Sequence, residues 1–264
     1  MAAQFKLGVV VSYSSNESQF LAAQCRELAI CADQIVYSVG SHLYDMRREA
    51  PLDLSMLEPK FTVATYAVEE DVKSNPRKYH NLARSAGFAA LKEDVTWVLF
   101  LDADEIPDGR AVKAFFQTNA KHFFEKMAYK FACHWYFVKS TWRATSDEDS
   151  IVLVHRSQLN AESLADVNER DGIVRRCPGG CMRRIYSNAG TQRKPMFHHY
   201  SWVRSKAQAL HKVSTWGHRG DRRDWADLVE AAWSSPDPPA ADFVDFVHGY
   251  AYEVVEDTFD LISP

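Results

Sequence analysis

The apolar positions of the first hundred residues form short continuous runs separated by amphipathic segments. Continuous β-branched runs predict buried strands, and apolar residues at helical spacing predict helices. Strands are predicted at 6–12, 34–39, 61–67 and 96–101, and helices at 20–32 and 76–91. This alternation indicates a mainly parallel sheet with helices on both faces.

The pattern changes after Pro107, where aromatic and β-branched runs become more frequent. These runs predict further strands of a mixed sheet, and the acidic triplet 147–149 between them is interpreted as an exposed loop. Strands are predicted at 128–138, 150–154, 180–186 and 197–202, and helices at 109–126, 205–215, 225–233 and 242–259. We interpret residues 1–203 as one α/β body and residues 204–264 as a helical extension of the same domain.

Composition limits the functions that the chain can have. An apolar content of 46% supplies a core and excludes a disordered chain, and a net charge of −4 argues against a nucleic-acid partner. No apolar run is long enough to cross a bilayer, so we expect no transmembrane segment. The five cysteines, an odd number without a secretory signal, are expected to be reduced thiols of a cytoplasmic protein, with no zinc site at Cys177 and Cys181.

The most informative segment is Trp97–Asp108, with the sequence WVLFLDADEIPD. A strongly apolar strand ends abruptly in acidic residues, and ligands of open α/β sheets bind beyond the carboxyl ends of strands. Asp102 and Asp104 project to the same side if the extended conformation continues past Leu101. Two adjacent carboxylates repel each other unless a cation lies between them, so the pair predicts a divalent ion that also binds a diphosphate. Alternatively, these residues could cap the helix that follows.

A second candidate segment is Met196–His218, with the sequence MFHHYSWVRSKAQALHKVSTWGH. His198 and His199 would face opposite ways on a strand, so only one of them can line a site, where a neutral imidazole would suit a manganese-like ion. Lys212 and His218 belong to a basic stretch that would stabilise charge on a diphosphate, although a solvated helix face is the plain alternative.

The segment WVLFLDADEIPD resembles the DxD segment of GT-A glycosyltransferases, especially the family-2-like group, over the first half of the chain. The resemblance implies a Rossmann-like GT-A fold that moves a sugar from a nucleotide-diphosphate donor, with UDP as the expected nucleotide, to a glycan or other hydroxyl acceptor. It also implies a Mn²⁺ or Mg²⁺ ion that Asp104 ligates directly. Asp102 would contact the ribose or the metal through water. His199 would be the third metal ligand, because HxSW-type segments accompany the DEIP motif.

The same resemblance implies further binding and catalytic residues. Ser12, Tyr13 and Glu17 would contact the nucleotide from the first strand and its loop, and Asn81 and Arg84 would do so from the helix before the DxD strand. The pair Glu148 and Asp149 is similar to the "ED" element that supplies the base of inverting enzymes. The second strand departs from the family pattern, since it lacks the usual Asp pair.

Three other functions remain open. A dehalogenase-type phosphohydrolase also uses an apolar strand ending in DxD, but it places the motif on the first strand and not near residue 102. A nucleotidyltransferase should carry a glycine-rich loop after the first strand, and SYSSNESQF contains no glycine. A non-catalytic carbohydrate-binding protein would not need the acidic pair together with a late histidine.

Overall fold

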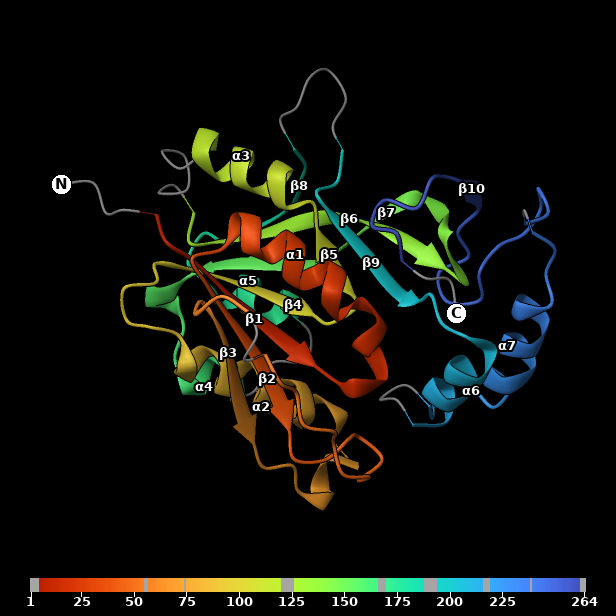
Figure 1. Cartoon of the computed structure of the whole chain (residues 1–264), viewed down its shortest axis with the longest axis horizontal. Helices are drawn as coiled ribbons and strands as arrows, with labels where there is room; N and C mark the ends of the chain where they lie inside the picture. The colour runs from red at the N-terminus through yellow and green to blue at the C-terminus, as the bar shows by residue number, and fades with distance from the viewer. Residues whose placement is uncertain are drawn as a thin grey trace.

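The chain folds around one mixed sheet flanked by helices (Figure 1). The structure, a computed structural model, describes residues 5–54, 57–73, 75–119, 126–165, 170–187, 194–215, 219–237 and 239–261. The strands are β1 (Leu7–Tyr13), β2 (Gln34–Gly40), β3 (Phe61–Tyr66), β4 (Trp97–Asp102), β5 (Glu105–Pro107), β6 (Ala128–Phe137), β7 (Lys139–His155), β8 (Cys181–Ile185), β9 (Phe197–Trp202) and β10 (Tyr252–Val254). The helices are α1 (Leu21–Cys31), α2 (Pro76–Ala90), α3 (Gly109–Asn119), α4 (Ala161–Ala165), α5 (Arg170–Arg176), α6 (Lys206–Thr215) and α7 (Trp225–Trp233), with 3₁₀ turns at Ser15–Phe20, Glu70–Lys73 and Arg156–Gln158.

The sheet combines a parallel half with a half that contains antiparallel pairs. Its order is β3-β2-β1-β4-β7-β6-β9-β5, with β10 beside β7 and β8 beside β6. Strands β1 to β4 pair in parallel, whereas β7 runs antiparallel to both β4 and β6. The predicted mixed, mainly parallel Rossmann-like α/β architecture is therefore confirmed.

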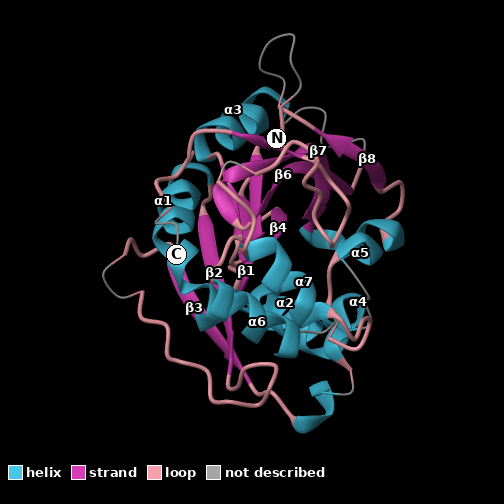
Figure 2. Ribbon diagram, turned by 90° about the vertical axis from the view of Figure 1, so that its right-hand side faces the viewer, coloured by secondary structure: helices cyan, strands magenta, loops and turns pink. Residues whose placement is uncertain are grey.

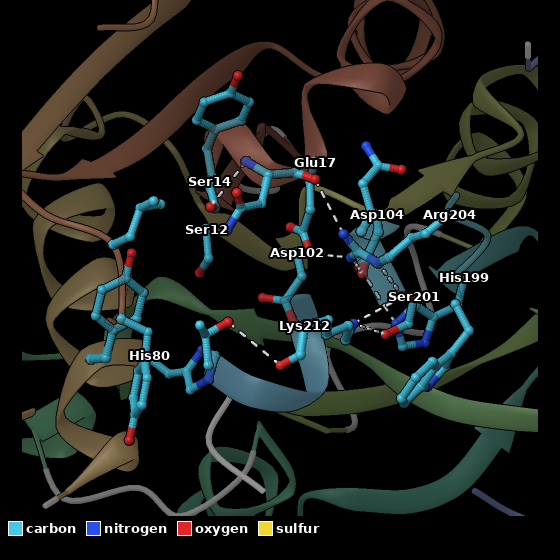
Figure 3. Close-up of a pocket in the computed structure, with 18 of the residues that line it drawn as sticks. Ser12, Ser14, Glu17, His80, Asp102, Asp104, His199, Ser201, Arg204 and Lys212 are labelled. Carbon is cyan, nitrogen blue, oxygen red and sulfur yellow. Dashed lines mark hydrogen bonds and ion pairs between the residues drawn. The ribbon is translucent and has the colours of Figure 1, made fainter. Parts of the chain in front are cut away.

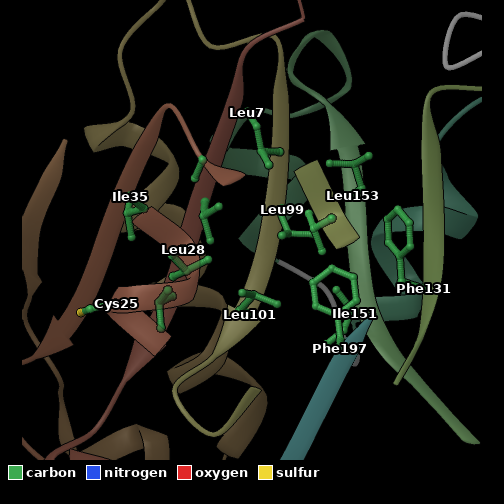
Figure 4. Packing of buried hydrophobic residues seen from close by; sticks show 14 of the residues in the cluster. Leu7, Cys25, Leu28, Ile35, Leu99, Leu101, Phe131, Ile151, Leu153 and Phe197 are labelled. Carbon is green, nitrogen blue, oxygen red and sulfur yellow. The ribbon is translucent and has the colours of Figure 1, made fainter. Parts of the chain in front are cut away.

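Helices cover both faces of the sheet. Figure 2 shows α1 and α3 on one side of it and α2, α4 and α5 on the other. Alternate residues of β4 divide between these layers: Leu99 and Leu101 pack toward α1 and α3, and Val98 and Phe100 pack toward α5. Figure 4 shows the first of these cores, where strand residues meet Cys25 and Leu28 of α1. The uninterrupted apolar runs of the sequence arise from this burial on both faces.

Residues after 204 form a further layer around the far half of β6, β7 and β9. Helices α6 and α7 bury their apolar faces in a third cluster that contains Phe137, Trp142 and Trp202. In the described residues, no helix combines the length and apolar character needed to span a membrane.

Three predictions about local structure are wrong. The terminal segment 242–259 is not a helix, because the Asp245 carboxylate accepts hydrogen bonds from the backbone N–H groups of Val247, His248 and Tyr250 and builds a turn. The triplet 147–149 is not a loop, because β7 continues through it and pairs with β6. The predicted helix 109–126 is not one of these errors. It is observed from Gly109 to Asn119, and residues 120–125 lie outside the described part.

The third error concerns the acidic segment itself. The strand conformation stops at Asp102, and Ala103 and Asp104 form a turn before β5 begins at Glu105. The backbone of Asp102 donates to Glu105 Oε2 at 2.8 Å, which closes this turn locally. Asp102 and Asp104 still reach the same cleft, but through the turn and not through an extended strand.

Candidate functional site

A cleft of about 1510 Å³ lies beyond the carboxyl ends of β1 and β4. Strand register brings its floor together: Ser12 is paired with Asp102 across β1 and β4, and His199 is paired with Glu105 and Trp135 across β9. The predicted residues that line the cleft are Ser12, Tyr13, Glu17, Arg84, Asp102, Asp104, Glu148, His199 and Lys212. The cleft is thus where the sequence predicted it, at the end of the most apolar strand.

One carboxylate oxygen of Asp102 and one of Asp104 are buried beside this cleft. Within the described residues, Oδ1 of Asp102 and Oδ1 of Asp104 make no hydrogen bond, and the nearest cation-forming group to Asp104 Oδ1 is the His199 imidazole, whose Nε2 lies 3.5 Å away. The other oxygen of each side chain faces an arginine: Arg170 Nη2 lies 3.4 Å from Asp102 Oδ2, and Arg204 Nη2 lies 3.5 Å from Asp104 Oδ2. A buried carboxylate oxygen without a donor is costly unless a ligand satisfies it, so these two atoms mark a binding position.

Glu105 anchors the acidic turn beneath the cleft. Its fully buried carboxylate receives two hydrogen bonds of 2.5 Å from Arg170 and one of 2.6 Å from Ser150 Oγ. Arg170 also faces Asp102, so one guanidinium holds both ends of the turn. Burial alone would raise the pKa of the Asp102 carboxyl, but Arg170, followed by His80 and Arg84, lowers it. Asp102 is therefore anionic at neutral pH.

His199 approaches the turn from β9. Its Nε2 lies 3.5 Å from Asp104 Oδ1 and its Nδ1 lies 3.9 Å from Glu105 Oε1. Burial opposes charge on both partners, yet their close contact holds the pKa of Asp104 well below its usual range and raises the pKa of His199 well above its own. His198 points the other way and bonds Tyr136 Oη through Nδ1 at 2.8 Å. Of the two histidines, only His199 lines the cleft, and its role as a metal ligand stays a prediction.

Acidic and basic side chains face the turn from the 3₁₀ turn Ser15–Phe20, from the residues just before α6 and from α6 itself. Arg204 Nη2 donates to Glu17 Oε1 at 2.7 Å, and Lys212 Nζ donates to Ser201 Oγ at 2.7 Å and Ser201 O at 2.9 Å. Figure 3 shows these side chains grouped around Asp102 and Asp104. Burial, followed by the charge of Asp104, raises the pKa of Glu17 to about 7. Burial, followed by Arg204, lowers the pKa of Lys212 to about 8.

The acceptor-side candidate Glu148 lines the cleft from the middle of β7. Tyr250 Oη donates to Glu148 Oε1 at 2.5 Å, and His248 Nε2 lies 3.8 Å from the same oxygen. The turn built by Asp245 positions both of these partners. The C-terminal segment, whose fold the sequence did not predict, therefore forms one wall of the cleft.

Two predicted site residues lie away from the cleft, and one is outside the described residues. Asn81 is buried beside α4, where its amide donates to Ala165 O at 3.1 Å, and it does not line the cleft. Asp149 faces the opposite side of β7 from Glu148 because side chains alternate along a strand, and it pairs with Lys130 at 3.2 Å and Arg184 at 3.1 Å. His218 lies outside the described residues.

Sequence reasoning missed Arg170, His80 and His248, all of which line the cleft. Arg170 begins a short helix that follows an unremarkable polar stretch, so nothing local marks it. His80 had a usable signal, since it directly precedes Asn81 in the helix segment that was singled out.

The residues present fit a divalent cation. Two buried carboxylate oxygens that make no hydrogen bond and a nearby imidazole form the oxygen-rich donor set that Mg²⁺ and Mn²⁺ accept. A cation would displace the proton that His199 shares with Asp104, because imidazole ligates a metal through a neutral nitrogen. Among the residues described, no three His, Cys, Asp or Glu side chains already stand at metal-enclosing distances.

Comparison with known proteins gives only partial likenesses. No protein-family model and no curated protein matches the chain. The 4-diphosphocytidyl-2C-methyl-D-erythritol synthase from Anaerococcus prevotii is 10% identical, with a TM-score of 0.41 over 66% of this chain and 82% of its own. Rv0371c from Mycobacterium tuberculosis is 14% identical, with a TM-score of 0.37 over 66% of this chain and 81% of its own. An Rv0371c homologue from Mycobacterium sp. strain JC1 is 14% identical, with a TM-score of 0.40 over 72% and 87%. Likenesses at this level do not assign a function.

Proposed function

We propose that the chain is a metal-dependent glycosyltransferase that moves a sugar from a nucleotide-diphosphate donor to a hydroxyl acceptor. The observation that supports this most directly is the pair of buried oxygens on Asp102 and Asp104 that make no hydrogen bond, beside the His199 imidazole and a cleft at the carboxyl ends of the strands. Mg²⁺ and Mn²⁺ in phosphate sites are commonly bound by one or two carboxylates together with the substrate phosphates. Asp102, Asp104 and His199 would hold the ion, which would supply positive charge to the leaving diphosphate.

The cationic side chains of the cleft add to this stabilisation. Lys212, Arg84 and Arg204 line the same cleft and are close enough to influence the charges of the acidic turn. Fixed positive groups in a water-poor site stabilise the charge that develops as the glycosidic bond to the diphosphate breaks. Ser12, Tyr13 and Glu17 would contact the nucleoside from the end of β1.

Glu148 is the proposed base. It lines the cleft, whereas Asp149 does not, and the hydrogen bond from Tyr250 leaves its second oxygen to accept the proton of an acceptor hydroxyl. This assignment predicts an inverting reaction, because a base that activates the acceptor directly favours a single displacement.

A nucleotidyltransferase is the second candidate, because the same cations would bind a triphosphate and one of the partly similar structures is a diphosphocytidyl-methylerythritol synthase. The residues after β1 distinguish the two candidates. The N–H groups of Ser15, Asn16 and Glu17 already donate to Glu49 Oε1, Ser14 Oγ and Ser14 O. These groups therefore do not form an open backbone cradle for a triphosphate.

Product analysis separates these functions. The chain is incubated with Mn²⁺ and either a panel of nucleotide-diphosphate sugars with hydroxyl-bearing acceptors or nucleoside triphosphates with sugar phosphates. We expect free nucleoside diphosphate from the sugar donors, and UDP binding by calorimetry that requires Mn²⁺. Pyrophosphate release from a triphosphate would instead establish the second candidate, and inorganic phosphate from a sugar phosphate would establish a phosphohydrolase. Absence of nucleotide binding with and without Mn²⁺ would contradict both transferase candidates.

A further inference from the structure

Beneath the acidic turn, on the face away from the cleft, lies a fully buried glutamine, Gln24 of α1. Its Nε2 donates to the backbone oxygen of Asp102 at 2.9 Å and to that of Glu105 at 2.8 Å. One side-chain amide therefore joins the residue that ends β4 to the residue that begins β5. Gln24 does not itself line the cleft.

The orientation of this amide is set by Tyr37 of β2. Tyr37 Oη donates to Gln24 Oε1 at 3.0 Å, and both side chains are completely buried. A flipped amide would place Oε1 against two carbonyl oxygens and an amino group against the hydroxyl, so a single orientation satisfies every partner. Cys25 Sγ, 3.2 Å from Tyr37 Oη, completes the buried contact.

A polar network at this depth is unnecessary for packing alone. Burying an amide costs free energy unless all of its hydrogen bonds form, and a methionine of similar volume would fill the same space without that requirement. The amide does what an apolar side chain cannot, because it fixes the separation of two backbone carbonyls. Between these carbonyls lie Ala103 and Asp104, so their separation determines how the Asp102 and Asp104 carboxylates are aimed.

We propose that Gln24, oriented by Tyr37, is a positioning residue that aims the Oδ1 atoms of Asp102 and Asp104 at a shared divalent cation. The proposal rests on the function proposed above. Arg170 and Ser150 hold Glu105 from the cleft side of the turn, and Gln24 holds the backbone from the other side. The turn is thus fixed between two layers of the fold, and cation affinity depends on a residue that touches neither the metal nor the nucleotide.

The test compares Gln24→Met with a matched control, Gln34→Met. Gln34 is also a buried glutamine that joins two backbone groups, donating to Ala90 O at 3.3 Å and accepting from Lys92 N at 2.8 Å. It begins β2 at the end of the strand opposite the cleft. Both substitutions remove a buried bridging amide, so both are expected to lower thermal stability, but only Gln24 is expected to affect the cation.

The readouts are thermal unfolding and calorimetric titration of Mn²⁺ and of UDP in the presence of Mn²⁺. We expect Gln24→Met to weaken both affinities about tenfold or more, as outer residues of metal sites do, with Gln34→Met unchanged. Tyr37→Phe retains Gln24 but releases its orientation, so we expect an intermediate loss of about three- to tenfold. The Tyr37→Phe variant tests the same proposal if Gln24→Met does not fold.

The possible failures are distinct. If the wild type binds Mn²⁺ and UDP and the Gln24 and Tyr37 variants bind them equally well, the positioning role is wrong and the proposed function stands. Equal losses in Gln24→Met and Gln34→Met would show a general effect of stability and would also overturn it. If the wild type binds neither ligand, the proposed function fails and the positioning role fails with it.

Discussion

The Asp104 carboxylate lies between two positively charged or protonatable side chains. Arg204 and His199 approach it from two sides, and Glu17 shares Arg204 with it. Replacement of Asp104 by Asn keeps the shape but removes the charge and one cation-binding oxygen. We expect UDP binding in the presence of Mn²⁺ to weaken at least about a hundredfold, more than for an outer residue of a metal site.

Calorimetry with Mn²⁺ and UDP measures this loss, and Asp94→Asn is the control. Asp94 is an exposed acid that pairs with Lys6 away from the cleft, so its replacement should leave binding unchanged. The metal role of Asp104 would be contradicted if the Asp104→Asn protein folds and binds UDP with the wild-type affinity and the same requirement for Mn²⁺.

We expect Lys212 to make nucleotide binding depend on pH. Burial, followed by Arg204, lowers the pKa of its ammonium from an ordinary 10.5 to about 8, so half of the free protein lacks this charge near pH 8. A bound diphosphate favours the charged form and raises that pKa. Binding near pH 8 should therefore take up protons, and UDP affinity should fall as the pH rises above about 8.

Titrations in two buffers with different ionisation enthalpies measure this proton uptake directly. Lys212→Met is expected to bind UDP more weakly at pH 7 and to lose the part of the uptake that is centred near pH 8. Identical uptake in the variant would assign the proton to another group.

At the scale of elements, β7 separates two acidic neighbours by its alternation. Glu148 faces the cleft and Asp149 faces Lys130 and Arg184. We expect Glu148→Gln to lower turnover of the nucleotide sugar about 10²- to 10⁴-fold with UDP affinity retained, as for loss of a general base. Asp149→Asn should keep turnover and lose about 1–3 kcal/mol of stability with its charged hydrogen bonds. Turnover assays and urea unfolding of both variants distinguish them, and a reversed outcome would move the base to Asp149.

Helix α5 holds the acidic turn through Arg170, which pairs with both Glu105 and Asp102. Replacing Arg170 by Met leaves the fully buried Glu105 carboxyl without its guanidinium partner, which should cost about 3–5 kcal/mol of unfolding free energy. The double variant Arg170→Met with Glu105→Gln removes the carboxyl that lost its partner and should recover part of this loss in urea unfolding. Additive losses in the double variant would mean that the two side chains do not stabilise each other.

The elements that the sequence predicted well are those with one dominant period. Strand β9 and helix α7 have the predicted bounds, and the buried Trp225, Val229 and Ala232 of α7 follow helical spacing. The segment 242–259 failed because the Asp245 side chain competes for the backbone N–H groups that a helix would use, and Gly249 adopts a positive φ of 71°. The first part of β7 did carry a signal, since Trp142 and Ala144 are buried and Arg143 between them is not.

At the scale of the whole molecule, the third apolar cluster joins the C-terminal segment to the sheet. The buried ring of Phe137 in β6 contacts the rings of Trp202, Trp233, Phe246 and Tyr252. We expect Phe137→Ala to cost about 3–5 kcal/mol, as for other buried phenylalanines. Urea unfolding measures the loss, with Val254→Ala, at a 57% exposed side chain, as a control that should change little.

The candidate site could be predicted only where the chain is locally informative. Asp102, Asp104 and His199 belong to patterned segments, and their side chains do meet in one cleft. Arg170 and His248 reach that cleft through the packing of α5 and of the Asp245 turn, which no spacing in the sequence encodes. Partners of this kind depend on tertiary arrangement. The acidic residues of the turn can therefore be recognised from the sequence, whereas the basic residues that pair with them cannot.

Strands β6 and β7 both extend from the two cores of the sheet into the C-terminal cluster, and they stay paired with register shifts between Phe131 and Phe137. A hinge between the floor of the cleft and the Glu148 side would have to disrupt the ladder that joins these strands, so we expect no large rigid-body opening as a route for substrate exchange. We expect conformational gating to be confined to the rim of the cleft, where Asp45 and Arg47 of the segment 41–48 approach His211 of α6. Substitutions there should alter the rate of product release and leave the chemical step unchanged.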